Sequence, residues 1–247
     1  MSKKLLFIIG ILSFCITAGV YWYYLSEPST LPKKEELKNR INRVYSDTEV
    51  VSIQDTILLD SRHLYVPFIS KNNDYGSSFW VWKKRKWEIE ALNDVGQPIL
   101  WKIDNKDPSS YRIVWNIHPE DQFKAAEFYL SRDRGYEITN GIEFYYPKVQ
   151  LNKEFTLSEK SYRIKKLPRN WASIIQSTNN IHNPDRMSIL DGDNAEHSLL
   201  IAWKPVFDKK NGDDIFSKRS ISGGGFSNGG DYDIISLVEE HQLENQQ

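Results

Sequence analysis

Four consecutive cations between tryptophans form the most distinctive chemical cluster of this sequence. The run reads Trp80-Val81-Trp82-Lys83-Lys84-Arg85-Lys86-Trp87. Strand alternation sends Trp80 and Trp82 to one face and Phe79 and Val81 to the other, while the cations must occupy a turn where they stay hydrated. Two interpretations remain open: a solvated turn above buried tryptophans, or a tip that binds lipid headgroups or an acidic wall polymer. The candidate binding residues are Trp80, Trp82, Lys83, Lys84, Arg85, Lys86 and Trp87.

Catalytic patterns are weak by comparison. His118-Pro119-Glu120-Asp121 brings an imidazole near two carboxylates, but a helix cap beside an ordinary histidine explains the same residues. The sequence has neither a P-loop nor Gly-x-Ser-x-Gly, and its one cysteine, Cys15, lies in an apolar segment. No catalytic residue and no cofactor are therefore predicted. Paired carboxylates brought together by folding leave no local spacing, so a hydrolase stays open as an alternative.

Metal-ligand patterns are also incomplete. Asp191-Gly192-Asp193-Asn194, followed by Glu196-His197, has oxygen ligands that suit Ca²⁺, but it lacks the ligand order of an EF-hand. The other histidines, His63, His182 and His241, form no His-x-x-x-His pair. We predict a polar turn at residues 191–194 and no metal site. Four further tryptophans could stack on a carbohydrate, but core packing is the favoured interpretation for Trp101, Trp115, Trp171 and Trp203.

The first 25 residues predict a membrane anchor. The run Leu5–Leu25 contains no charged side chain, and 21 residues of helix span about 31 Å, the hydrocarbon thickness of a bilayer. The run ends in Tyr21-Trp22-Tyr23-Tyr24, rings that settle at the headgroup level. A cleaved signal peptide with a site near Gly19 is the alternative. The predicted partner is therefore the lipid bilayer, through Leu5–Leu25.

The charges around the anchor bear on topology. Lys3 and Lys4 precede it, whereas five cations follow within about twenty residues, yet long domains are translocated largely regardless of charge. We expect a cytoplasmic N-terminus and an extracytoplasmic C-terminal domain on the cell membrane, or a secreted protein if the segment is cleaved. The absence of cysteine after Cys15 suits an exporting compartment. A net charge of −1 argues against nucleic acid as a partner.

Periodicity predicts a mainly β, α+β protein. A linker at 26–32 leads to an amphipathic helix whose apolar stripe is Leu37, Ile41 and Val44. Short apolar runs separated by turns then predict an antiparallel meander up to residue 118. Residues 119–247 read as a smaller β-rich part, either separate or in one domain with 33–118. It is expected to include a short helix through Phe128, strands at 137–139, 142–146 and 155–157, a helix at 168–176, a strand at 199–203 and a last element at 234–240. A flexible glycine loop is expected at 223–230.

This layout resembles uncharacterised single-pass, membrane-anchored extracytoplasmic proteins of Gram-positive bacteria, including in the segments 65–72 and Trp115-Asn116-Ile117-His118-Pro119. The resemblance implies no activity and no site residue. The residues favour a tethered, non-catalytic module that binds an envelope protein or an anionic wall polymer. A membrane-anchored envelope hydrolase and a structural subunit of a membrane complex are the alternatives.

Overall fold

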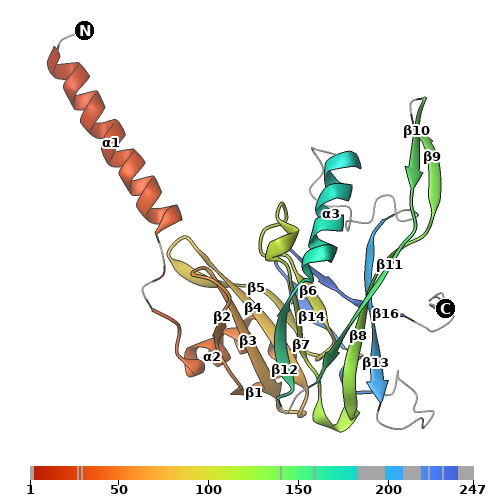
Figure 1. Ribbon diagram of the computed structural model, residues 1–247. Helices are drawn as coiled ribbons and strands as arrows, with labels where there is room; N and C mark the ends of the chain where they lie inside the picture. Colours follow the sequence, from red (N-terminus) through yellow and green to blue (C-terminus); the bar gives the residue numbers. More distant parts are fainter. Residues whose placement is uncertain are drawn as a thin grey trace. The chain divides into compact units, whose positions relative to one another are not determined.

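The computed structural model describes residues 3–26, 28, 30–139, 141–157, 160–182, 198–207, 218–221, 223–229 and 231–238. It is mainly β with three α-helices among these residues, as the sequence predicts. The chain divides into two compact units (Figure 1). The first comprises residues 1–93 and 225–229, and the second comprises residues 94–224 and 230–247. Residues 94–118, which the sequence analysis joined to the first meander, thus contribute their strands to the second unit.

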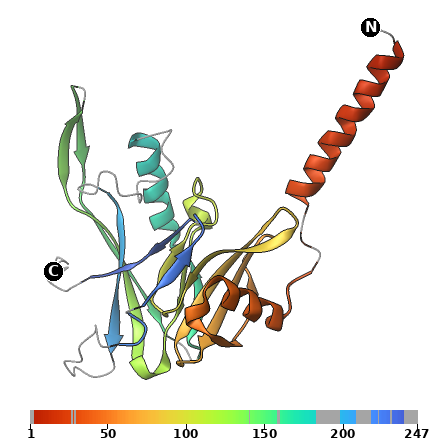
Figure 2. The ribbon, with the colours of Figure 1, turned by 180° about the vertical axis from the view of Figure 1, so that it is seen from behind.

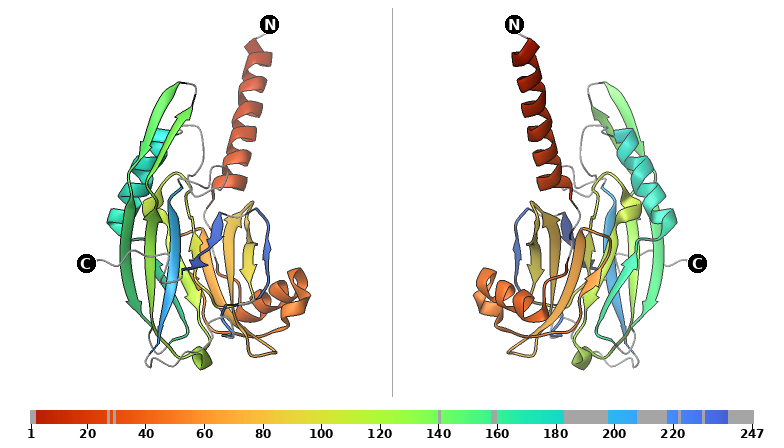
Figure 3. Two further views of the ribbon diagram at one scale, coloured as in Figure 1. Left: turned by 90° about the vertical axis from the view of Figure 1, so that its right-hand side faces the viewer. Right: turned by 90° about the vertical axis from the view of Figure 1, so that its left-hand side faces the viewer.

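The first unit begins with the apolar helix α1 (Lys3–Leu25), which has the length and composition to cross a membrane. A signal sequence would meet the same criteria. The helix is continuous in all views (Figures 1 and 3). None of its described side chains is buried by protein, as expected for residues in contact with lipid. The predicted apolar helix is thus confirmed.

Antiparallel strands form the body of the first unit. Their order is β1-β3-β4-β5-β14, with β2 paired to β3. The 3₁₀ turn η1 (Ser46–Thr48) leads into this sheet. The strands are β1 (Val50–Ile53), β2 (Ile57–Leu58), β3 (His63–Ser70), β4 (Tyr75–Lys83), β5 (Lys86–Asn93) and β14 (Gly225–Ser227). The strand β14 corrects the prediction of a purely flexible glycine loop, because its backbone pairs with Ala91, Leu92 and Asn93 of β5.

Helix α2 (Lys34–Val44) packs on this sheet (Figure 2). Leu37 and Ile41 are fully buried in a core with Trp80, Trp87 and strand residues of β3. Val44, the third residue of the predicted stripe, is instead 42 % exposed. The helix ends at this residue, so Val44 lies beyond the part of α2 that contacts the sheet.

The second unit contains two four-stranded sheets and one helix. One sheet has the order β12-β7-β6-β15 and the other the order β11-β8-β13-β16. Trp115, Trp203 and Phe128 belong to the core that both sheets share, and helix α3 adds Trp171 and Ile175. The elements are β6 (Ile99–Trp101), η2 (Pro108–Ser110), β7 (Arg112–Asn116), η3 (Pro119–Asp121), β8 (Phe123–Arg132), β11 (Val149–Thr156), β12 (Tyr162–Lys166), α3 (Arg169–His182), β13 (Leu200–Phe207), β15 (Tyr232–Ile234) and β16 (Ser236–Leu237).

The predicted helix from Pro119 through Phe128 is wrong. Pro119–Asp121 forms a single 3₁₀ turn, and the left-handed backbone of Gln122 (φ 55°) ends it. The chain then enters β8, a central strand between β11 and β13. Most of its side chains are buried on both faces, so β8 lacks the alternation that identifies a half-exposed strand.

A β-hairpin extends β8 and β11 beyond the sheet (Figures 1 and 3). Its strands are β9 (Gly135–Thr139) and β10 (Ile142–Tyr146), both predicted from the sequence. Tyr136 lies opposite Tyr145, so these two rings and Ile138 share one face. Their exposed fractions are 56 %, 61 % and 60 %. The sequence predicts these strands but not the exposure of their apolar side chains.

Candidate functional site

The β4–β5 hairpin ends in the four predicted cations, and all four are exposed. Lys83 pairs with Lys86 across the hairpin, which leaves Lys84 and Arg85 as a two-residue turn. Both turn residues have left-handed backbones, with φ of 50° and 63°. This is the geometry of a type I′ turn, for which Asn-Gly is the favoured sequence. We call residues Lys83, Lys84, Arg85 and Lys86 the basic tip.

The basic tip carries a conformational cost. A residue other than glycine in the left-handed region costs about 1 kcal/mol or more. The right-handed twist of the strands imposes this turn type, and Asn-Gly would form it with much less strain. Two cations at these positions are thus costly for the fold, and such strain is common at functional sites.

Ion pairs neutralise part of the basic tip. Lys83 Nζ lies 2.8 Å from a carboxylate oxygen of Glu90, and Lys86 Nζ lies 2.8 Å from one of Glu88. The lysines of these pairs are exposed and the glutamates are half-buried, so water screens both pairs and each contributes little to stability. Within the described ranges, Lys84 forms no ion pair. The turn therefore presents its charge mainly through Lys84 and Arg85.

The basic tip contacts the end of the apolar helix. The guanidinium carbon of Arg85 lies 3.7 Å from the ring centroid of Trp22, and Arg85 Nη1 donates to Ser26 Oγ at 3.0 Å. Trp22 belongs to the aromatic segment that the sequence assigns to the headgroup level. These contacts place the Arg85 guanidinium beside the ring of Trp22.

A second arginine caps the same helix. Arg62 donates from Nη1 to the carbonyl of Tyr24 at 3.2 Å, and from Nη2 to the carbonyls of Leu25 and Ser26. The last carbonyls of a helix lack partners within the helix, and a cation there also suits the helix dipole. The sequence analysis missed Arg62, because its contacts span 36 to 38 residues along the chain.

Asp60 holds the turn that presents Arg62. Its Oδ1 accepts from the backbone N–H of Arg62 at 2.7 Å and from that of His63 at 2.9 Å. Burial raises the pKa of Asp60, but hydrogen bonds from Arg62 and His63 outweigh it and hold the pKa below its usual value. The carboxylate is therefore ionised at neutral pH and keeps these hydrogen bonds.

The three candidate tryptophans lie on β4 and β5, and each indole N–H donates a hydrogen bond. Trp80 is fully buried, and its Nε1 donates to Ser78 Oγ at 2.9 Å. Trp87 is 3 % exposed and donates to the carbonyl of Thr30. Trp82 is half-buried and donates to the carbonyl of Ser26 at 2.9 Å. Trp82 and Trp87 thus tie the linker after α1 to the hairpin.

His118, Glu120 and Asp121 form a structural turn. His118 Nδ1 accepts from the Glu120 backbone N–H at 3.1 Å, so His118 itself caps the 3₁₀ turn, whereas the sequence predicted a helix cap beside this histidine. The carboxylate of Asp121 accepts from the backbone N–H groups of Arg219 and Ser220 at 2.9 and 3.0 Å. His118 and Asp121 are both 2 % exposed. Their hydrogen bonds join two distant segments of the second unit.

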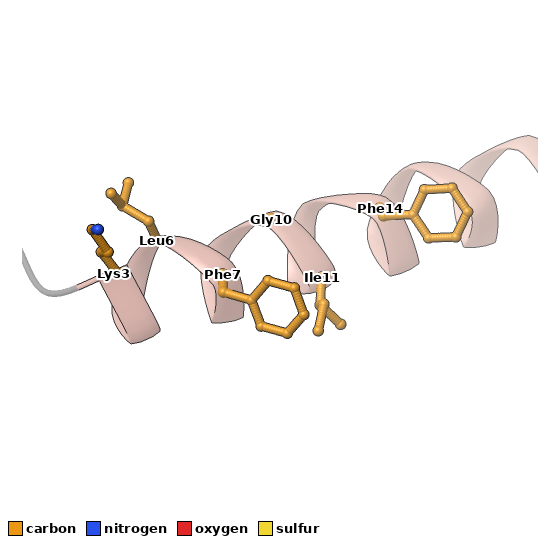
Figure 4. Close-up of a pocket in the computed structure, with 6 residues that line it drawn as sticks. All are labelled: Lys3, Leu6, Phe7, Gly10, Ile11 and Phe14. Atoms are coloured by element: carbon orange, nitrogen blue, oxygen red, sulfur yellow. The ribbon is translucent and has the colours of Figure 1, made fainter.

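No group of three or more potential metal ligands occurs among the described residues. The sequence motif at 191–197 lies outside them, as does His241. A surface hollow lies on α1 itself, over Gly10 (Figure 4). Its lining is apolar apart from Lys3, which suits contact with lipid. Lys3, Leu6, Phe7, Gly10, Ile11 and Phe14 line it.

Comparisons with protein-family models, with curated proteins and with solved structures found no match to this chain. The features of this protein that bear on function are thus the basic tip and its contacts with α1.

Proposed function

We propose that this protein is a membrane-anchored extracytoplasmic binding module without catalytic activity, and that its basic tip binds anionic lipid headgroups. The observation that carries the proposal is the contact of Arg62 and Arg85 with the last residues of α1. If α1 spans the bilayer, these contacts hold the cations at the depth of the headgroup phosphates. Near an anionic membrane each such cation contributes roughly 1 kcal/mol.

The geometry of the tip supports phosphate as the ligand. The guanidinium of Arg85 has five N–H donors, and only Nη1 has a described hydrogen bond, to Ser26. Lys84 adds an ammonium group in the same turn. Arginine forms bidentate hydrogen bonds with phosphate, and lysine binds it as a point charge. The headgroup contact would hold the first unit close to the bilayer surface.

Hydrogen exchange of the full chain in lipid nanodiscs tests the lipid contact. We expect the amides of residues 83–86 to exchange more slowly when phosphatidylglycerol replaces part of the phosphatidylcholine, and this protection to fall at high salt. Replacing Lys84 with Asn and Arg85 with Gly should reduce this lipid-dependent protection about thirtyfold, because two contacts of roughly 1 kcal/mol each are lost. The same change should stabilise the hairpin, since Asn-Gly is the favoured turn.

The control removes the same charge elsewhere. Replacing Lys165 and Lys166 in the second unit with Gln should leave the lipid effect on residues 83–86 unchanged. Equal protection in neutral and anionic nanodiscs would contradict the proposal. So would an equal increase in protection, from neutral to anionic nanodiscs, in the parent protein and in the Asn-Gly variant.

Protease digestion of intact protoplasts tests the topology. With the N-terminus inside, added protease should remove the domain from about residue 28 onward and leave the anchor in the membrane. Lysed protoplasts provide the control for protease resistance. Protection of the domain in intact protoplasts would reverse the orientation. A mature protein in the medium that begins near Val20 would show that the helix is a signal peptide.

A further inference from the structure

Strand β12 is an open edge of its sheet. It pairs with β7, and within the described ranges no strand pairs with its other side. The N–H of Ile117 donates to the carbonyl of Ser161, and the N–H of Leu167 donates to the carbonyl of Tyr111. In an antiparallel ladder these bonds recur at every second residue, so Arg163 and Lys165 also bond toward β7. Ile164 and Lys166 therefore direct their backbone N–H and C=O groups away from the sheet.

The side chains of this edge are strongly basic. The 23 residues from Lys160 to His182 contain five Lys or Arg residues and no Asp or Glu. Three of the five lie on β12 itself: Arg163, Lys165 and Lys166. Within the described ranges, Lys165 and Lys166 form no ion pair with a carboxylate. The basic edge, as we call residues 160–169, thus combines the outward backbone groups of Ile164 and Lys166 with excess positive charge.

Two contacts of these cations act on stability in opposite directions. Lys166 lies directly opposite Arg112 in the β12–β7 ladder, and like charges in that position are destabilising. The Nζ of Lys165 lies 5.6 Å from the ring centroid of Phe155, which belongs to the margin of the core. This cation–π contact holds the Lys165 ammonium group beside the strand.

We propose that the basic edge binds an extended acidic peptide of a partner protein, which adds to the sheet as a strand next to β12. Backbone hydrogen bonds to Ile164 and Lys166 would supply part of the affinity, as in other cases of strand addition. Carboxylates at alternate positions of the peptide would reach Arg163 and Lys165 on one face or Lys166 on the other.

Charge complementarity selects this occupant. A second copy of the chain paired through β12 would place Arg163, Lys165 and Lys166 against the same residues of its partner. Lysines on an edge strand commonly prevent such self-pairing. They do not oppose an acidic strand, for which the same charges are attractive. The charges of the basic edge thus favour an acidic strand over a second copy of the chain. The backbone groups of Ile164 and Lys166 can form hydrogen bonds with that strand.

The test uses the full chain in nanodiscs of phosphatidylcholine and a fluorescent eight-residue peptide in which Glu alternates with Val. We expect binding by fluorescence anisotropy at low salt, and slower hydrogen exchange at the amides of Ile164 and Lys166. A peptide with Lys in place of each Glu should not bind. Replacing Lys165 and Lys166 with Gln should weaken binding by up to about thirtyfold, because two ion pairs of up to about 1 kcal/mol each are lost.

A second variant tests the backbone contact. Ile164→Pro removes an N–H that the sheet does not use, and proline is accepted at such edge positions. It should weaken peptide binding with all cations still present, whereas Ile164→Val should bind like the parent. Circular dichroism checks that Ile164→Pro is folded; if it is not, the Lys165 and Lys166 variant decides.

Three outcomes would overturn the proposal. They are no binding of the Glu peptide at low salt, equal binding of the Lys peptide, and binding without added protection of Ile164 and Lys166. The last would indicate a general polyanion surface rather than strand addition. The Asn-Gly variant of the basic tip should bind the peptide normally, so failure here and failure of the lipid contact are separate results.

Discussion

Replacing Gly96 with alanine is expected to destabilise the second unit by about 3 kcal/mol. A Cβ atom at this position would lie 2.0 Å from the carbonyl oxygen of Asn116 and 2.6 Å from its carbonyl carbon. Both atoms belong to the backbone of β7, so no side-chain rotation can relieve the overlap. The carbonyl of Gly96 also accepts from the N–H of Asn116 at 3.0 Å. Separating the two segments would lengthen that hydrogen bond.

Hydrogen exchange of the β7 and β8 amides measures this effect within the second unit. Gly141→Ala is the control, because its Cβ would meet no atom within 4 Å. The φ of Gly141 is +77°, so that substitution should cost only about 1 kcal/mol through backbone strain. Comparable exchange in the two variants would contradict the steric explanation for Gly96.

Replacing Trp203 with alanine should cost about 3–5 kcal/mol, the usual range for a buried tryptophan. The residue is fully buried in the core of the second unit. Its ring centroid lies 6.0 Å from that of Phe123 and 6.5 Å from that of Phe128. The loss of these contacts would leave a large cavity between the sheets.

Trp203→Phe separates ring packing from hydrogen bonding. Within the described ranges the indole N–H of Trp203 meets no acceptor. Phenylalanine keeps a ring and removes this buried donor, so its cost should stay below about 2 kcal/mol. Denaturant unfolding of the full chain in detergent compares the two variants. Equal losses for Phe and Ala would mean that the indole N–H has a partner in the folded protein.

Burial also distinguishes core packing from carbohydrate stacking for the other three tryptophans. Trp101, Trp115 and Trp171 are each 1 % exposed. None of these rings is accessible to a carbohydrate, which confirms the core interpretation. The spacing of the residues along the sequence could not distinguish these possibilities, because exposure depends on which strands cover each ring.

Local patterns predict the elements whose hydrophobicity has a simple period. The uncharged run from Leu5 to Leu25 predicts α1, and the i, i+4 spacing of Leu37 and Ile41 predicts α2. Alternating runs bounded by turn residues predict most strands, including β3 and β5. Strand β12 escaped prediction because its side chains are mostly charged, so it lacks an apolar pattern.

The sequence by itself determined that an apolar N-terminal helix precedes a β-rich part and that four adjacent cations are exposed. The first follows from the length that an uncharged run reaches as a helix, and the second from the hydration that adjacent charges require. Both depend only on residues that are neighbours in the sequence. Only the tertiary structure decided that Arg62 caps α1, that Asp121 accepts from the backbone of Arg219 and Ser220, and that β12 is an edge strand among the described residues. These depend on pairings between residues far apart in the chain, for which local spacing carries no signal.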